Sequence, residues 1–458
     1  MKYVLFLCCA MTMVACKTEP KINYALLSGK VTNATTDKVT VYSVDFDQEI
    51  SIKPDGTFAD TLKLTEPGFY DFSIGREVTK IYLKHGDVLN ISVDQNLFDE
   101  TIKYSGKGAV ENNYLATKQQ NNEKHTDNSQ ELYLLDEQAF KTKVEELKQS
   151  NASLLSELID ADPNFIADET KNLEYDSYSL LTAYEGSHKY YTKNEEFTVS
   201  ETFLPEALKQ LTFDDSKAYK NSSSYKNMAF RKVLDTIFDT IGEDYQNAST
   251  EHLKTITEIQ IPALKNDVIR YLGSFLISPG NPNMESVYTF FTNNVTDSKI
   301  KENLDATYAK GKDLVRGKPS PQFTNYENHK GGTLSLADLK GKYVYIDVWA
   351  TWCGPCKREI PYLKEVETQF HGKNIEFVST SIDVAKDHDK WDAMVRDMQL
   401  GGVQLFADND WKSQFVTDYA IEGIPRFILV DPDGNIISAD APRPSNPKLV
   451  ELFNSLKI

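Results

Sequence analysis

Residues 343–359 of this chain read YVYIDVWATWCGPCKRE. The stretch begins with β-branched and aromatic residues, which are typical of a buried strand. Two cysteines three residues apart follow, Cys353 and Cys356, with Pro355 between them and a charged, helix-like segment after them. Proline fits the first turn of a helix because its missing N–H would have no partner there. The stretch therefore predicts a strand that leads into a helix, with a C-x-x-C motif at the junction.

The placement of the two cysteines predicts a redox site. Cys353 falls at the expected helix N-terminus, where unpaired N–H groups and the helix dipole favour the thiolate, the form that attacks a disulfide. Cys356 follows one turn later and can resolve a mixed disulfide. A zinc site is the alternative, but it needs two further Cys or His ligands. His329, His371 and His388 are isolated in the sequence, so no metal is expected.

Further positions make this stretch resemble the active site of the thioredoxin superfamily. Asp347 precedes the first cysteine by six residues, where thioredoxins keep a buried aspartate as proton acceptor. Pro361 follows the second cysteine by five residues, where the family kinks its active-site helix. The pair Ile424-Pro425 matches the family's cis-proline loop. From roughly residue 317 to 458, the chain is similar to the TlpA/ResA-like branch of membrane-tethered thiol–disulfide oxidoreductases.

The resemblance implies a role for each of these residues. The first cysteine is expected to be the nucleophile and the second the resolving thiol. Asp347, if buried, would exchange a proton with the second cysteine; the alternative is a solvated strand carboxylate. Trp352 is expected to shield the pair and shape a docking surface, with simple packing as its alternative. The backbone of Ile424, ahead of a cis Pro425, is expected to pair with an extended substrate segment. No cofactor beyond the dithiol is implied.

The N-terminal sixteen residues predict export. A short basic start and the apolar residues 3–15 are typical of a signal peptide and too short for a convincing spanning helix. Residues 13–16, MVAC, resemble a bacterial lipobox, which implies that Cys16 becomes an acylated N-terminus. Ordinary secretion with cleavage nearby is the alternative. Of the five cysteines, cleavage would remove two and acylation would occupy one, so the mature chain would keep a single free dithiol.

Length, charge and patterning organise the rest of the chain. The net charge of −18 argues against nucleic-acid binding, which needs a clustered basic surface. Short β-like runs between turn signals predict a small antiparallel sandwich, which resembles a β-domain found ahead of thioredoxin-like domains in Bacteroidetes lipoproteins. Helical periodicity follows, and then strands alternate with helices. The chain of 458 residues is therefore divided into a signal peptide (1–15), a β-sandwich-like domain (16–108), a helical domain (109–312) and an α/β thioredoxin-like domain (313–458).

Individual elements are also predicted. Apolar stripes indicate helices at residues 139–150, 230–241, 262–275 and 298–309, and polar composition indicates loops at 118–128 and 213–224. In the last domain, strands are expected at 375–381, 403–407 and 426–430, and helices at 389–399, 410–419 and 447–456. Asp383, Asp387, His388 and Asp389 are interpreted as a solvated loop and helix cap.

The leading functional hypothesis is an envelope-side, lipid-anchored thiol–disulfide oxidoreductase facing the periplasm, in the inner or outer membrane. Gly354-Pro355 is the thioredoxin-type dipeptide, which in that family goes with a potential on the order of −270 mV and favours a reductant. The family implies disulfide-containing envelope proteins such as apocytochrome c as partners, and a membrane electron donor. A peroxiredoxin-like peroxidase is one alternative, but it needs Thr or Ser where this chain has Ala350. A lipoprotein binding module with a vestigial redox domain is another.

Overall fold

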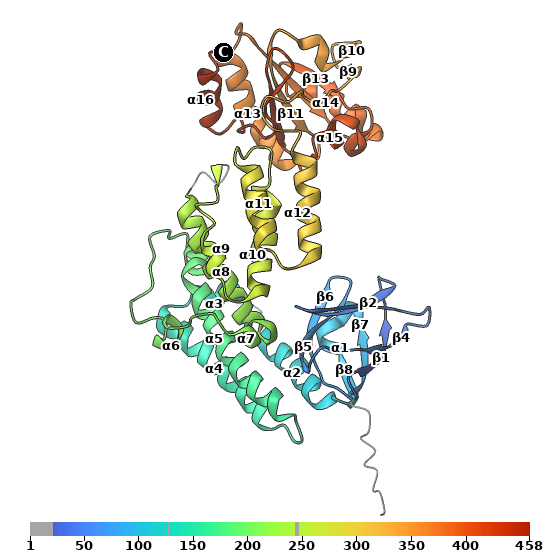
Figure 1. Cartoon of the computed structure of the whole chain (residues 1–458), viewed down its shortest axis with the longest axis vertical. Coiled ribbons are helices and arrows are strands. Elements are labelled where there is room, and N and C mark those ends of the chain that lie inside the picture. Colours follow the sequence, from blue (N-terminus) through green and yellow to red (C-terminus); the bar gives the residue numbers. More distant parts are fainter. Residues whose placement is uncertain (1–21, 127, 243–246) are drawn as a thin grey trace, which may run out of the picture. The chain divides into compact units, whose positions relative to one another are not determined.

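The computed structural model describes residues 22–126, 128–242 and 247–458 (Figure 1). The chain divides into two compact units, Met1–Ala229 and Phe230–Ile458. The predicted signal peptide and Cys16 lie outside the described residues. Within the described ranges, no helix has both the length and the apolar character that a membrane span needs.

The first unit begins with two four-stranded sheets that share one hydrophobic core. The sheet orders are β4-β1-β7-β8 and β3-β2-β5-β6. Leu27 and Leu89 of the first sheet belong to the same buried cluster as Val41 and Phe72 of the second, so the predicted sandwich is confirmed. The β1–β7 pair is parallel, whereas the other pairs of these sheets are antiparallel. The strands are β1 (Ala25–Thr32), β2 (Lys38–Ser43), β3 (Phe46–Ser51), β4 (Thr57–Leu62), β5 (Gly68–Ile74), β6 (Glu77–Leu83), β7 (Val88–Asp94) and β8 (Lys103–Lys107).

Two consecutive asparagines at the start of α2 (Ala109–Thr126) cover the edge strands of this sandwich. Asn112 accepts a hydrogen bond from the Tyr82 N–H of β6 and donates one to the Tyr82 carbonyl, both at 2.8 Å. Asn113 makes the same pair of bonds with Tyr104 of β8, at 3.1 and 2.9 Å. Each side-chain amide thereby takes the place of a neighbouring strand at an edge that would otherwise be open to pairing.

The prediction of a loop at residues 118–128 is wrong, because α2 continues to Thr126. Its polar residues contact another helix instead of solvent alone. Asn121 donates to Asn151 of α4 (Glu137–Ser156) at 2.7 Å, and Asn151 donates to Asn122 at 2.8 Å. The hydrogen bonds hold a helix whose outer half lacks an apolar stripe, which is why sequence periodicity did not reveal it.

The helix α5 (Pro163–Thr192) contacts α4 and two shorter helices, α3 and α7, whose bounds follow below. Its Phe165 is fully buried and contacts the rings of Phe69 and Tyr82, so aromatic packing joins α5 to the sandwich. The loop predicted at residues 213–224 is also wrong: it contains a short helix, which Asp215 caps by accepting from two backbone N–H groups. The other helices here are α1 (Phe98–Thr101), α3 (Ser129–Leu134), α6 (Glu206–Lys209) and α7 (Ser216–Asn221), with the 3-10 helix η1 (Gln95–Leu97).

The helix α8 (Ser223–Ile241) begins in the first unit and continues into the second. The helices predicted from Pro262 and Ser298 are confirmed as α10 and α12, and Asp297 caps α12 by accepting from the Ile300 N–H at 3.0 Å. The lack of a side chain at Gly273 lets these two helices approach, since a Cβ there would lie 2.4 Å from Leu304. The helices are α9 (Thr255–Glu258), α10 (Pro262–Leu276), α11 (Met284–Asn294) and α12 (Ser298–Gly311).

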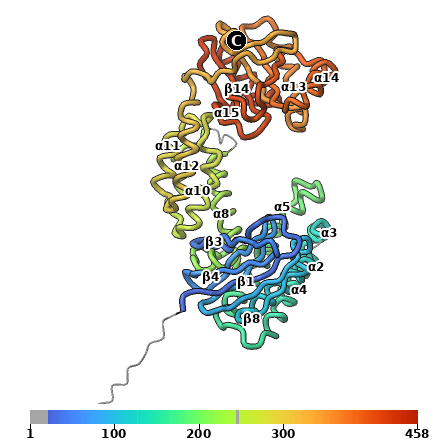
Figure 2. Tube along the Cα trace, turned by 90° about the vertical axis from the view of Figure 1, so that its right-hand side faces the viewer, coloured from blue at the N-terminus to red at the C-terminus, as the bar shows by residue number. Residues whose placement is uncertain are grey.

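The C-terminal domain is a seven-stranded mixed sheet in the order β10-β9-β13-β12-β11-β14-β15. It forms the orange-to-red end of the trace in Figure 2. The central strand β11 runs parallel to β12 and antiparallel to β14. Buried residues of α13 and α16 pack on one face, and those of α14 and α15 on the other. The predicted thioredoxin-like architecture is confirmed.

The elements of this domain follow the predicted order, although the helix expected at 410–419 is split into a 3-10 turn and a short α-helix. The strands are β9 (Tyr326–Asn328), β10 (Thr333–Leu334), β11 (Tyr343–Trp349), β12 (Ile375–Ser381), β13 (Val403–Phe406), β14 (Arg426–Val430) and β15 (Ile436–Ser438). The helices are η3 (Leu336–Leu339), α13 (Gly354–Gln369), η4 (Ala385–Asp387), α14 (His388–Asp397), η5 (Asp410–Lys412), α15 (Gln414–Asp418) and α16 (Lys448–Ser455).

Candidate active site

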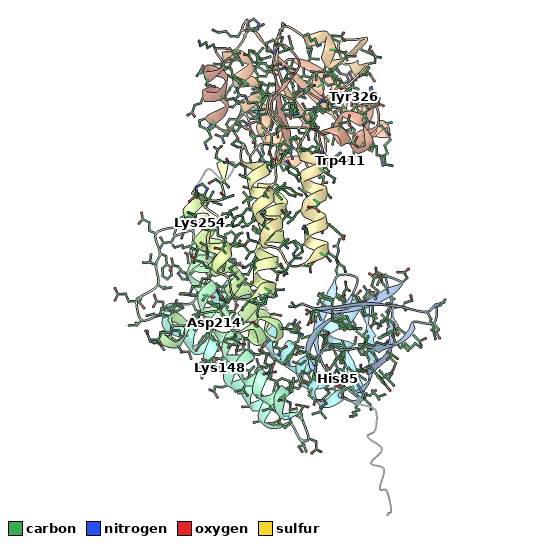
Figure 3. All side chains as sticks on the ribbon, in the orientation of Figure 1. His85, Lys148, Asp214, Lys254, Tyr326 and Trp411 are labelled. Atoms are coloured by element: carbon green, nitrogen blue, oxygen red, sulfur yellow. A yellow bond between two sulfur atoms is a disulfide. The ribbon has the colours of Figure 1, made fainter. Side chains whose placement is uncertain are left out.

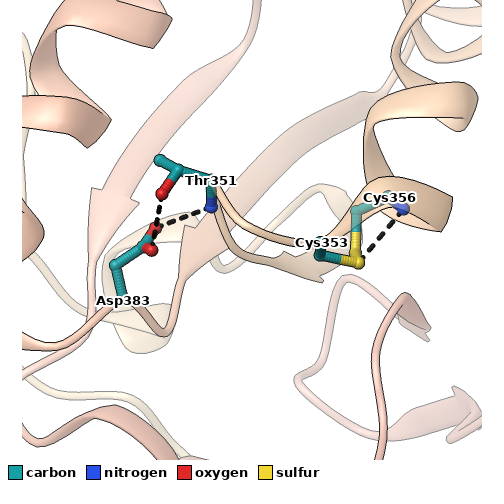
Figure 4. The surroundings of a disulfide bond; sticks show 4 residues. All are labelled: Thr351, Cys353, Cys356 and Asp383. Carbon is teal, nitrogen blue, oxygen red and sulfur yellow. Dashed lines mark hydrogen bonds between the residues drawn. A yellow bond between two sulfur atoms is a disulfide. The ribbon is translucent and has the colours of Figure 1, made fainter.

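The two cysteines lie at the start of α13, just after the end of β11, and they are joined by a disulfide (Figure 4). Cys353 is the N-cap of α13, and its Sγ accepts a hydrogen bond from the Cys356 N–H at 3.1 Å. Pro355 stands in the first turn, where its missing N–H costs no hydrogen bond. Each cysteine is only 3% exposed. A thiolate on Cys353 would therefore receive backbone N–H groups and the positive end of the helix dipole.

The turn before Cys353 is held by Asp383, which Figure 4 shows opposite Thr351. Thr351 donates to the two carboxylate oxygens of Asp383, from its backbone N–H at 2.9 Å and from its hydroxyl at 2.7 Å. Ser381 donates a third hydrogen bond at 2.7 Å. Asp383 is 1% exposed, so its interpretation as part of a solvated loop is wrong. Because Trp349 pairs with Ser381 in the parallel β11–β12 register, the residues just beyond both strands meet.

Asp347 is buried on β11, with 7% of its surface exposed, so it is not a solvated strand carboxylate. Burial raises the pKa of this carboxyl to about 8, the nearby Ser379 hydroxyl opposes part of the shift, and the carboxylates of Glu359 and Glu367 add to it. The side chain shares a cavity with Ile360 of α13, one turn beyond Cys356. A carboxyl that holds its proton near neutral pH suits exchange of a proton with a thiol.

The exposed rim of the site is aromatic. Trp352 is 55% exposed, and its ring centroid lies 6.4 Å from that of Trp411, which is labelled in Figure 3. The Ile424–Pro425 peptide is cis, and Ile424 packs against the same hydrophobic cluster that contains the cysteines. Within the described residues, no hydrogen bond is made by the backbone of Ile424. The rim thus offers an apolar contact and a free backbone N–H and carbonyl.

Comparison with known proteins agrees with this geometry. Residues 316–439 match the model of the AhpC/TSA family. The thiol-disulfide oxidoreductase ResA of Bacillus subtilis (strain 168) is 27% identical over 153 residues, which are 33% of this chain and 82% of that protein. The C-terminal domain is homologous to the ResA thiol-disulfide oxidoreductases.

Two solved structures resemble this ResA-like domain. One is the thioredoxin domain of a thiol-disulfide oxidoreductase from Bacteroides vulgatus, 30% identical, which covers 31% of this chain and 98% of its own, with a TM-score of 0.28. The other, a solution structure from the same organism, is 55% identical and covers 31% of this chain and 90% of its own, also with a TM-score of 0.28.

The structure adds charged residues to the ResA-like site that sequence analysis missed. Glu359 of α13 is 9% exposed and accepts hydrogen bonds from the backbone N–H and hydroxyl of Ser445, both at 3.0 Å. Burial raises the pKa of Glu367, also on α13, to about 7. Both residues fall in a helix whose charged pattern is typical of a solvated face. Their burial comes from segments far away in the chain, so no local signal could have found them.

Proposed function

We propose that this protein is a lipid-anchored, envelope-side thiol–disulfide oxidoreductase that reduces protein disulfides through Cys353 and Cys356. The observation that carries the proposal is the disulfide between two buried cysteines at the N-terminus of α13. Anchoring at Cys16 and a periplasmic location rest on the lipobox-like residues 13–16. The Gly354-Pro355 dipeptide favours a reducing potential.

The reaction proceeds in two thiol exchanges. In the first, the Cys353 thiolate attacks one sulfur of a client disulfide; a mixed disulfide forms, and the other client sulfur leaves as a thiolate that takes a proton from solvent. In the second, the Cys356 thiol gives its proton to Asp347, and the resulting thiolate attacks Cys353 Sγ. The Cys353–Cys356 bond forms and the second client thiol is released. Two electrons pass to the client, and a membrane thiol donor must restore the dithiol.

The aromatic rim supports an extended client segment. Trp352 and Trp411 supply apolar area next to Cys353, and the unpaired backbone of Ile424 can add such a segment as a short β-pairing. Backbone pairing selects for extended shape more than for sequence, which suits several clients. We infer that these are disulfide-containing envelope proteins, with apocytochrome c among them by family resemblance.

Trapping tests the proposal. A Cys356→Ser chain in its native cell should accumulate mixed disulfides through Cys353, identified by mass spectrometry. The matched control is the Cys353→Ser/Cys356→Ser double variant, which should capture none. Equal capture by both variants, or none by either, contradicts the proposal. The reducing direction is tested separately: a measured potential near the strongly oxidising value of about −120 mV would contradict it.

A thiol peroxidase is the second candidate, because residues 316–439 match the AhpC/TSA family model. A peroxidatic cysteine needs a hydroxyl beside it to bind the peroxide. The nearest sequence candidate, Thr351, directs its hydroxyl to Asp383 at 2.7 Å. Disulfide exchange therefore fits the geometry better. If the reduced chain consumed peroxide faster than free thiols do, the peroxidase would become the better candidate. If Cys353→Ser left the cellular phenotype unchanged, a vestigial redox domain would be favoured.

A further inference from the structure

A small cavity lies under the active site, between the central strands and α13. Its walls include Asp347, Trp349, Glu367 and Gln404. It leaves about 10 Å³ for the centre of a water-sized sphere, which is room for one water molecule. The dithiol chemistry described above uses only the Asp347 wall of this cavity.

Three buried polar atoms of the cavity walls have no hydrogen-bond partner within the described part of the chain: Asp347 Oδ1, Trp349 Nε1 and Gln404 Oε1. The three residues are 7%, 2% and 5% exposed. Buried polar atoms are nearly always satisfied, by protein or by ordered water. One water in the cavity would accept from the Trp349 N–H, donate to Gln404 and bond to Asp347. The donor and acceptor types of the walls therefore fit a bound water.

Glu367 connects this cavity to the surface. It lines the cavity while remaining partly exposed, and its carboxylate fills space left by a glycine. A Cβ on Gly401 would lie 2.1 Å from Glu367 Oε2. A side chain at position 401 would thus push the carboxylate away from its place.

The charges around Glu367 come from four elements. Burial raises its pKa to about 7, whereas Lys364 of α13 and Lys330 after β9 lower it and Glu376 of β12 raises it further. Asp347 of β11 lines the same cavity, and the Glu367 carboxylate disfavours a negative charge on it. Glu367 is therefore a group that can take up and release a proton near neutral pH.

We propose that Glu367 is the outlet of a proton path that starts at Asp347 and runs through a water held by Trp349 and Gln404. The inference rests on the proposed function, in which Cys356 gives its proton to Asp347 when it attacks the mixed disulfide. The water accepts the proton from Asp347 and passes one of its own to Glu367, and Glu367 releases it to solvent. Asp347 thereby passes on the proton that it took from Cys356, and no oxidant other than the client disulfide is needed. Glu367 acts through Asp347 and touches no client atom.

The test separates the two thiol exchanges. The reduced full chain is mixed with dithiobis(nitrobenzoate), which releases one coloured thiolate when Cys353 attacks and a second when Cys356 closes the ring. The first phase scales with reagent concentration and the second does not. Glu367→Gln should slow the second phase on the order of tenfold near pH 7, leave the first unchanged, and regain speed as acetate buffer is raised.

Two further variants keep the test decisive. Gly401→Ala should slow the second phase as Glu367→Gln does, because its Cβ displaces the carboxylate. Glu365→Gln, an exposed position on the same helix, is the matched control and should change neither phase. A second phase with wild-type rate and pH profile in Glu367→Gln, or equal slowing of both phases without acetate rescue, overturns the path. If Asp347→Asn slows ring closure and Glu367→Gln does not, only the path fails and the proposed function stands.

Discussion

Replacing Asp347 with Asn should stabilise the oxidised C-terminal domain, and increasingly so as the pH rises. The pKa of this carboxyl moves from 3.8 in the unfolded chain to about 8 in the fold. Between these values, the folded protein keeps a proton that the unfolded chain has lost. The unfolded state thus binds fewer protons, so stability falls as pH rises, from about pH 4 up to about pH 8, and levels off above it.

The size of the effect follows from the same shift. Each pH unit in this window costs about 1.4 kcal/mol of unfolding free energy. Relative to Asn, which does not titrate, Asp347 should therefore cost about 1.5 kcal/mol at pH 5 and about 5 kcal/mol at pH 8. The advantage of Asp347→Asn should grow by about 3.5 kcal/mol between the two conditions.

Urea unfolding followed by tryptophan fluorescence measures this. All four tryptophans lie between residues 349 and 411, so the signal reports the C-terminal domain of the full chain. The protein is kept oxidised throughout. Asp389→Asn, at a fully exposed carboxylate, is the matched control and should differ from the wild type equally at both pH values. An advantage of Asp347→Asn that is the same at pH 5 and pH 8 would contradict this prediction, because it would show that Asp347 is ionised in the fold at both pH values.

Three further predictions follow from specific contacts. Thr351→Val leaves one oxygen of buried Asp383 without its donor and should cost about 1–3 kcal/mol of unfolding free energy, measured by urea titration. Asn112→Ala removes both bonds to the Tyr82 backbone, so hydrogen exchange at the Tyr82 amide should accelerate more than tenfold, as about 1.4 kcal/mol of lost protection would give. Trp411→Ala removes part of the docking rim and should raise KM for a disulfide peptide with little change in kcat, measured by steady-state reduction of the peptide.

Each of these has a control. Thr368→Val alters an exposed hydroxyl that bonds only its own helix, so it should cost a few tenths of a kcal/mol. Tyr104 amide exchange should stay slow in Asn112→Ala, since Asn113 covers it. A fall in kcat for Trp411→Ala without a change in KM would place Trp411 in the chemical step and contradict its docking role.

Local patterns predicted the redox domain well. The strand–cysteine–helix junction, the helix N-terminus at Cys353 and the position of Asp347 all lie within residues 343–359. The strands predicted at 375–381 and 426–430 are β12 and β14 at their observed bounds. Each of these segments buries one face of a helix or a continuous run of a strand. Its apolar residues therefore follow a pattern that can be recognised within the segment itself.

Sequence patterns failed where polar contacts replaced hydrophobic ones. The outer half of α2 is polar because Asn121 and Asn122 bond to Asn151 of another helix. In the strands β3, β4 and β8, at least half of the residues are exposed, and none of these strands carries a run of apolar side chains. Periodicity detects only elements that bury an apolar face, and these elements are held by backbone pairing and side-chain amides.

Consecutive residues were enough to predict the dithiol, the strand–helix junction that carries it and the class of fold around it. The carboxyls that surround this site could be identified only from the folded chain. Asp383 meets Thr351 across 32 residues, and Glu359 meets Ser445 across 86. The local sequence of a charged helix or loop suggests that its carboxylates are solvated. The strand or loop that buries such a carboxylate is known only from the folded structure. Burial and the shifted pKa values depend on neighbours that local propensity does not encode, because they are set by the register of distant segments.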